Sequence, residues 1–103
     1  MLSENVHQFG DWFEVMAETS CSQVAMMRLD AGKGSGDFPE SHPHSDQILL
    51  VLEGEVEGEI SGERHVLKKG EFVLVAAGTP HRFVNNGQKA ALTFNLYAPP
   101  AYT

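Results

Sequence analysis

The stretch Gly36-Asp37-Phe38-Pro39-Glu40-Ser41-His42-Pro43-His44-Ser45-Asp46-Gln47 decides how the rest of this 103-residue chain is interpreted. Pro43 cannot continue a helix, and it pushes the residue before it, His42, toward extended conformations. In an extended chain, residues i and i+2 point to the same side. We therefore expect His42 and His44 to project together, as two imidazoles that bind one metal ion would.

A third histidine, His81, lies in a second informative stretch, residues 70–85. The apolar run Phe72-Val73-Leu74-Val75 is followed by Gly78-Thr79-Pro80, and this composition predicts a strand, a turn and a further strand that begins near His81. Three imidazoles at one place suit a borderline divalent metal, namely zinc, iron, nickel, copper, manganese or cobalt.

Together, the two stretches resemble the paired motifs of the cupin superfamily. The first cupin motif has glycine, five residues, His-x-His, three or four residues, glutamate, six residues and glycine. Its positions are matched here by Gly36, His42, His44 and Gly54. Gln47 stands where the motif has glutamate, and the gap between His44 and Gln47 is one residue shorter than usual.

The second cupin motif has glycine, five residues, Pro-x-Gly, two residues, histidine, three residues and asparagine. Its positions are matched by Gly70, Gly78, His81 and Asn85, and Ala76 replaces the proline. The resemblance covers about residues 24–98 and implies a double-stranded β-helix, a jelly-roll barrel that aims its histidines into the mouth. It also implies that His42, His44, Gln47 and His81 are metal ligands, and that the chain forms a homodimer.

The strand pattern favours an all-β fold independently of this resemblance. Many short apolar or alternating runs are separated by glycine-rich turns, and no convincing helix is present. Residues 48–52 form a continuous apolar run that predicts a strand buried on both faces. Beyond it, the glutamates at 53, 55, 57 and 59 share odd numbering with Gln47, so an unbroken strand would turn them toward the metal side. We therefore predict a bulge or bend near Gly54.

The length suits one domain, residues 1–103, with a barrel core at about 12–98, an arm at 1–11 and a tail at 99–103. Fourteen acidic against seven basic residues give a net charge of −7, which argues against a nucleic acid or an anionic membrane as partner. The single cysteine, Cys21, cannot form an intrachain disulfide, and no signal peptide or membrane-length apolar run is found. We expect a cytoplasmic protein with a small-molecule ligand.

Gln47 is the informative departure from the motif. A glutamine offers the metal a neutral carbonyl oxygen, so three imidazoles and one amide leave the charge of a divalent ion uncompensated. This favours an anionic substrate or a bound hydroxide. Two alternatives remain open: the metal binds through three histidines alone, or Asp46 serves in place of Gln47.

For function, the resemblance implies a metal-dependent enzyme such as a dioxygenase, an isomerase or a lyase. The sequence identifies no catalytic residue and does not choose among these reactions. The alternative is a non-catalytic module that binds or senses a sugar or another small molecule. A metal-free epimerase that works by His/Tyr proton transfer ranks last, because such enzymes are usually longer and lack the full ligand set.

Overall fold

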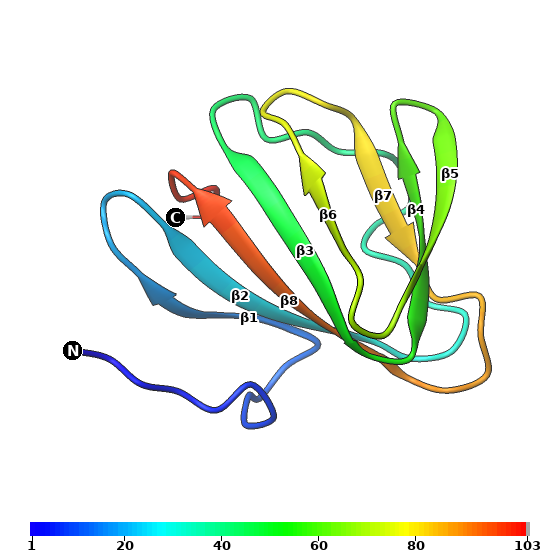
Figure 1. Ribbon diagram of the computed structural model, residues 1–103, viewed down its shortest axis with the longest axis horizontal. Coiled ribbons are helices and arrows are strands. Elements are labelled where there is room, and N and C mark those ends of the chain that lie inside the picture. The colour runs from blue at the N-terminus through cyan, green and yellow to red at the C-terminus, as the bar shows by residue number, and fades with distance from the viewer. Residues whose placement is uncertain (103) are drawn as a thin grey trace.

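The computed structural model describes residues 1–102, and in this range the chain forms eight strands and no helix (Figure 1). The strands are β1 (Phe13–Glu18), β2 (Gln23–Leu29), β3 (Asp46–Glu53), β4 (Glu55–Ile60), β5 (Glu63–Lys68), β6 (Phe72–Val75), β7 (His81–Val84) and β8 (Ala91–Ala98). The predicted all-β class is confirmed. No helix among the described residues is long and apolar enough to cross a membrane.

The strands form two antiparallel sheets, as the double-stranded β-helix requires. One sheet has the order β1-β2-β8-β3-β6 and the other the order β5-β4-β7. Apolar side chains from both sheets pack together into one core, which contains Met27, Leu29, Leu49, Val51, Val56, Leu67, Val75, Phe83 and Ala91. The predicted barrel is therefore confirmed, with its core between the two sheets.

The predicted break near Gly54 is also confirmed. The register of β3 against β8 shifts between Val51 and Glu53, and Gly54 follows with a φ of 73°. A Cβ at Gly54 would lie 2.8 Å from the carbonyl oxygen of Ala90, so the position excludes any other residue. Because of this bulge, the buried residues change from odd numbers in β3 to even numbers in β4.

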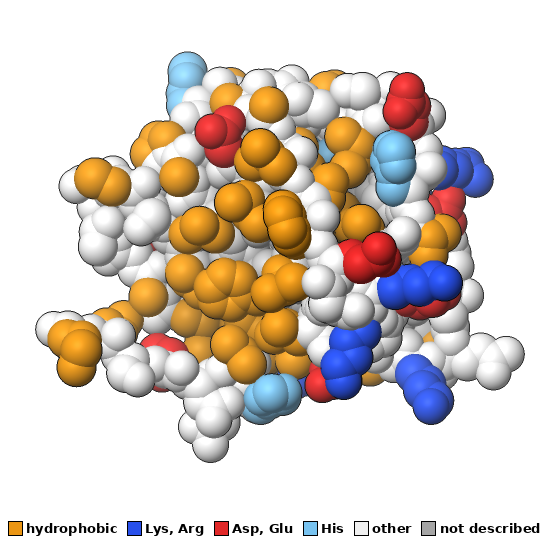
Figure 2. All heavy atoms as spheres, viewed as in Figure 1, with side chains coloured by type: hydrophobic (Ala, Val, Ile, Leu, Met, Phe, Trp, Pro, Cys, Tyr) orange, Lys and Arg blue, Asp and Glu red, His pale blue; other side chains and the backbone are white. Residues whose placement is uncertain are grey.

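The apolar run in β3 is buried on one face only. Leu49 and Val51 point into the core, whereas Ile48 and Leu50 stay partly exposed on the outer face of the five-stranded sheet. There they pair across strands with Leu74 and Phe72 of β6, which are 58% and 66% exposed. Figure 2 shows hydrophobic side chains gathered over β2, β8 and β3 on this face. The expectation that both faces of this strand are buried is wrong, because within residues 1–102 no second layer covers the outer one.

Candidate metal centre

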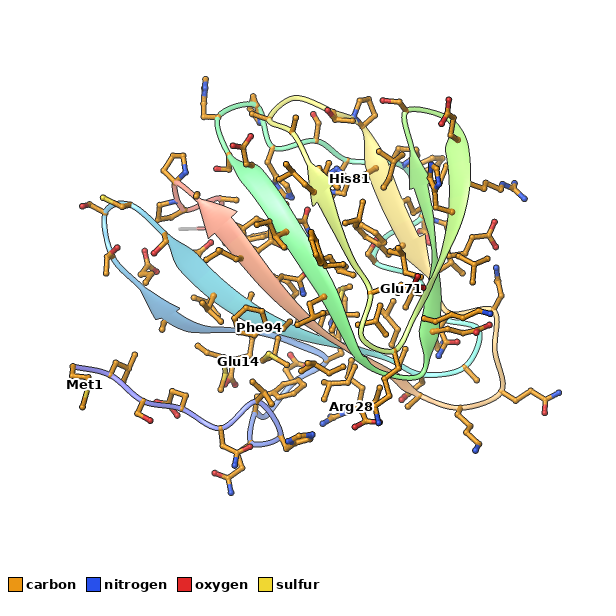
Figure 3. All side chains as sticks on the ribbon, viewed as in Figure 1. Met1, Glu14, Arg28, Glu71, His81 and Phe94 are labelled. Atoms are coloured by element: carbon orange, nitrogen blue, oxygen red, sulfur yellow. The ribbon has the colours of Figure 1, made fainter. Side chains whose placement is uncertain are left out.

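The candidate centre lies at one rim of the barrel, where β3 and β7 begin and where β6 and β8 end (Figure 1). His81 is the first residue of β7, and Figure 3 shows it at this rim. It faces Glu40 across an isolated antiparallel bridge: the Glu40 amide donates to the His81 carbonyl (2.9 Å), and the His81 amide donates to the Glu40 carbonyl (2.8 Å). Directly opposed residues carry their side chains on the same face, so Glu40 and His81 converge.

His42 joins this pair because it follows Glu40 by two residues along the same segment. The amide of Gly78 donates to the His42 carbonyl (2.9 Å) and holds the segment beside the turn that leads to His81. The potential ligand atoms of Glu40, His42 and His81 all lie within 4.8 Å of one another. Their side chains range from buried at His81 to exposed at Glu40, so one side of the group is open to solvent.

The tautomer of His81 is set by its neighbour. Its Nδ1 lies 2.9 Å from the carbonyl oxygen of Thr79, which can only accept, so in the neutral imidazole Nδ1 carries the hydrogen and Nε2 the lone pair. Nε2 of His81, Nε2 of His42 and Oε1 of Gln47 are all buried without a hydrogen-bond partner. Leaving such atoms unpaired is costly, and all three are atoms that bind divalent metals. The residues present therefore fit a metal ion.

Burial also favours the metal-binding form of His42. Desolvation lowers the pKa of His42, and the neighbouring His81 lowers it further, while Glu40 acts in the opposite direction. The neutral imidazole, which is the form that binds metals, is therefore favoured. Burial raises the pKa of Tyr97 and of Tyr102, so both phenols keep their protons near neutral pH.

His44 is not brought to the other three residues. The chain does not stay extended after His42: Pro43 and His44 form a turn, in which the Ser45 amide approaches the His42 carbonyl at 3.4 Å. Proline favours the second position of such a turn. The expected joint projection of His42 and His44 is therefore not found, and His44 is exposed. The assignment of His44 as a ligand stays a prediction.

Of the two residues weighed for the fourth position, Gln47 is the one that faces the interior. It is 3% exposed and lines the same cavity as Glu40 and His81. Asp46 is exposed, and its carboxylate accepts a hydrogen bond from the Ala77 amide (2.9 Å). Asp46 thus serves to fix the turn before β7, whereas Gln47 lines the cavity. The assignment of Gln47 as a ligand stays a prediction.

Glu40 was missed by the sequence analysis, although an irregularity pointed to it. The gap of two residues between His44 and Gln47 is too short for the first cupin motif, but the gap of four between His42 and Gln47 is regular. Counted this way, Glu40 occupies the first histidine position and Gly34 the opening glycine. Gly34 forms a bridge with Val84, and a Cβ there would lie 3.3 Å from the Phe83 carbonyl oxygen. Gly36 has no comparable contact.

A cavity of about 200 Å³ adjoins these residues. Its walls are mostly aromatic and include Trp12, Phe13, Phe83, Tyr97 and Tyr102. Such a cavity suits a small, flat and partly apolar ligand.

Tyr102 reaches the cavity from the C-terminal tail, which the sequence analysis treated only as a tail. The Oε1 atom of buried Gln23 accepts hydrogen bonds from the amides of Ala101 (3.1 Å) and Tyr102 (3.0 Å). The Tyr102 ring then lies 5.4 Å from the His42 ring and 5.1 Å from the Tyr97 ring, measured between centroids. A buried glutamine thus holds the tail across the mouth of the site.

Comparisons with known proteins agree with this architecture. Among solved structures, BH2720 from Bacillus halodurans is 25% identical with a TM-score of 0.87, and the match covers 95% of this chain and 77% of that one. KdgF from Halomonas sp. is 26% identical with a TM-score of 0.78, and the match covers 85% and 77% of the two chains.

Among curated proteins, quercetin 2,3-dioxygenase from Bacillus subtilis is 36% identical over 81 residues, which are 77% of this chain and 20% of that protein. The auxin-binding protein ABP19a from Prunus persica is 32% identical over 84 residues, which are 76% of this chain and 40% of that protein. The chain spans less than half the length of these curated relatives. The family model described as "Cupin domain" matches residues 25–97, most of the chain. This protein therefore belongs to the cupin family.

Proposed function

We propose that this protein binds one divalent metal ion through Glu40, His42, His81 and Gln47 and acts as a metal-dependent enzyme on a small molecule. The observation that carries the proposal is the set of buried, unpartnered lone-pair atoms on His42, His81 and Gln47, next to the Glu40 carboxylate. Borderline imidazole nitrogens and hard oxygen donors are mixed in this set, which suits iron, manganese, cobalt, nickel, copper or zinc.

The charge of this donor set differs from that of three histidines and a glutamine. Glu40 contributes one negative charge, so a divalent ion keeps one uncompensated positive charge instead of two. An anionic oxygen on the substrate, such as a carboxylate or a deprotonated hydroxyl, would neutralise it. Two histidines and one carboxylate with open positions are typical of non-haem iron(II) oxygenases.

Dioxygenation is the reaction that we favour within this proposal. It is supported by the likeness to quercetin 2,3-dioxygenase, whose name states an oxygen-dependent reaction, and by the aromatic cavity walls. A bound redox-active ion would supply dioxygen activation and Lewis acidity. The protein's own residues would do the rest: the aromatic walls would hold a flat substrate and exclude water. The hydrogen of the Tyr97 phenol is engaged by Tyr102, so the protonated phenol of Tyr102 would donate a hydrogen bond to an oxygen atom of the substrate.

A non-catalytic binding role is the second candidate. It is supported by the likeness to proteins named auxin-binding, at 29% and 32% identity. The same cavity and the same metal would then hold a small aromatic acid without turnover. The homodimer, the cytoplasmic location and the absence of nucleic-acid and membrane partners remain predictions.

The test compares metal content and oxygen consumption in the untagged wild-type protein and in His81→Ala, with His65→Ala as control. His65 is an exposed histidine outside the site, near Glu63. We expect about one equivalent of metal in wild type and in His65→Ala and none in His81→Ala. Metal-dependent oxygen uptake with a panel of flavonols and enols would establish the enzyme. Metal binding with ligand affinity but no turnover would favour the binding role. Equal metal content in wild type and His81→Ala would contradict both.

A further inference from the structure

A chain of buried hydrogen bonds runs from the backbone of β2 through β8 to Gln47. We infer that Thr93 and Asn95 are positioning residues that hold the Gln47 amide with its carbonyl oxygen toward the metal site. This inference rests on the metal centre proposed above and deepens it. Thr93 and Asn95 are fully buried, and together with Gln47 they lie on the inward faces of β8 and β3.

Four distances define the chain of bonds. Thr93 Oγ1 donates to the Met27 carbonyl (3.2 Å), and Asn95 Nδ2 lies within reach of Thr93 Oγ1 (3.0 Å) and the Ala25 carbonyl (3.4 Å). Gln47 Nε2 then donates to Asn95 Oδ1 (3.0 Å). Thr93, Asn95 and Gln47 each make at least one of these hydrogen bonds. The last atom of the series, Gln47 Oε1, has no partner among the described residues.

The direction of these bonds follows from their origin. Backbone carbonyls only accept hydrogen bonds, so Thr93 must donate its single hydrogen to Met27 and can then only accept from Asn95. Asn95 must therefore turn its amino group toward Thr93 and Ala25, which leaves Oδ1 facing Gln47. Gln47 must in turn present its amino group to Asn95, and its Oε1 faces the cavity. Reversing one amide would set two acceptors or two donors against each other inside the barrel.

The same series of hydrogen bonds explains why position 47 carries an amide side chain. A glutamate there would place a carboxylate oxygen against Asn95 Oδ1, so that two acceptors would meet at about the 3.0 Å separation seen now. The negative charge of the site is instead carried by Glu40, at the exposed edge of the group. Buried Asn95 thus determines that the side chain at position 47 offers the metal site a neutral amide oxygen.

The test measures cobalt(II) affinity, by competition with a chromophoric chelator, in wild type, Asn95→Leu and Asn85→Leu. Asn85 is a matched control: it is also buried, and its Nδ2 donates to the carbonyls of Leu29 (2.8 Å) and Lys89 (2.7 Å), but it does not contact Gln47. Both variants should lower the melting temperature of the metal-free protein. Only Asn95→Leu should weaken cobalt binding, by roughly 10- to 100-fold as is usual when the partner of a ligand is lost.

The visible absorption spectrum of bound cobalt should also change in Asn95→Leu, because an oxygen donor is no longer held in place, and should stay unchanged in Asn85→Leu. Thr93→Val and Thr93→Ser provide a second pair if Asn95→Leu does not fold: valine should weaken binding, and serine, which keeps the hydroxyl, should restore it. Equal cobalt affinity in wild type, Asn95→Leu and Thr93→Val would overturn the positioning role alone. No cobalt binding by wild type would overturn the metal centre itself and this inference with it.

Discussion

The two ends of the barrel interior differ sharply in chemistry, although the same strands build both. The inward face of β3 carries Gln47 at the rim and then Leu49 and Val51 in the core. Residues near the rim leave lone pairs unpartnered, whereas the core end is closed by packed apolar side chains. Folding stability should therefore reside at the core end and metal binding at the rim, and variants at the two ends should separate the two properties.

The largest effect should come from Leu49→Ala, at the core end. Leu49 is fully buried within the apolar cluster, so its truncation leaves a cavity and should lower the free energy of unfolding by about 2–5 kcal/mol. Chemical denaturation of the metal-free protein measures this loss. The folded fraction should still bind one equivalent of metal. Loss of metal binding from the folded protein would mean that the two ends are not independent.

Metal binding at the rim should give the next largest change in stability. A metal ion that binds only the folded state at 100 times its Kd stabilises it by about 2.7 kcal/mol. Thermal unfolding of chelator-treated protein, with and without added metal, measures the shift. A shift of equal size in wild type and Leu49→Ala would show that the two ends are independent. A smaller shift would measure their coupling, because Leu49 lies two residues from Gln47 and opposite Asn95. The shift should be absent in His81→Ala; a shift of wild-type size there would rule out His81 as a ligand.

Glu40→Gln should have a smaller effect on metal affinity than His81→Ala. It removes the only negative charge among the proposed ligands but keeps an oxygen donor, and because Glu40 is exposed, solvent screens much of that charge. We expect affinity to fall roughly 5- to 10-fold. Competition with a chelator measures it, and Glu63→Gln, at an exposed carboxylate that pairs with His65 and is outside the ligand group, is the control. An unchanged affinity would remove Glu40 from the ligand set.

The pH dependence of stability should be the smallest effect. His42 is held among Glu40, His81, Tyr97 and Tyr102, and burial lowers its pKa below the unfolded value of 6.5. At a pH between the lowered pKa of His42 in the folded protein and 6.5, the unfolded state binds one more proton than the folded state. The contribution of His42 to stability is therefore complete above about pH 6.5 and is lost as pH falls below it. The slope contributed by one proton is at most about 1.4 kcal/mol per pH unit. Metal-free His42→Leu should show a smaller slope than wild type.

Much of the fold was predictable from local sequence pattern. The eight strands follow alternation and turn residues, and the break at Gly54 follows from the conflict between the glutamates and the inward parity of Gln47. Gln47 was placed at the interior because side-chain direction alternates along a strand, and the interior position of His81 was implied by the resemblance to cupins; both residues are buried.

Which side chains come together at the candidate site depends on contacts between segments that are far apart in the sequence. Glu40 reaches the site because it is bridged to His81, and His44 is turned away because Pro43 takes part in a turn. Strand periodicity reveals neither, although the four-residue gap between His42 and Gln47 is a spacing signal for Glu40.

The sequence by itself thus determined the strands and the inward direction of Gln47. Only the tertiary structure decided that Glu40 lies beside His42 and His81, that Tyr102 lines the cavity and that Gln47 Oε1 has no hydrogen-bond partner among residues 1–102. The reason is physical: strand periodicity is a local property of the backbone, whereas bridges, tail anchors and buried hydrogen-bond chains depend on which strands become neighbours.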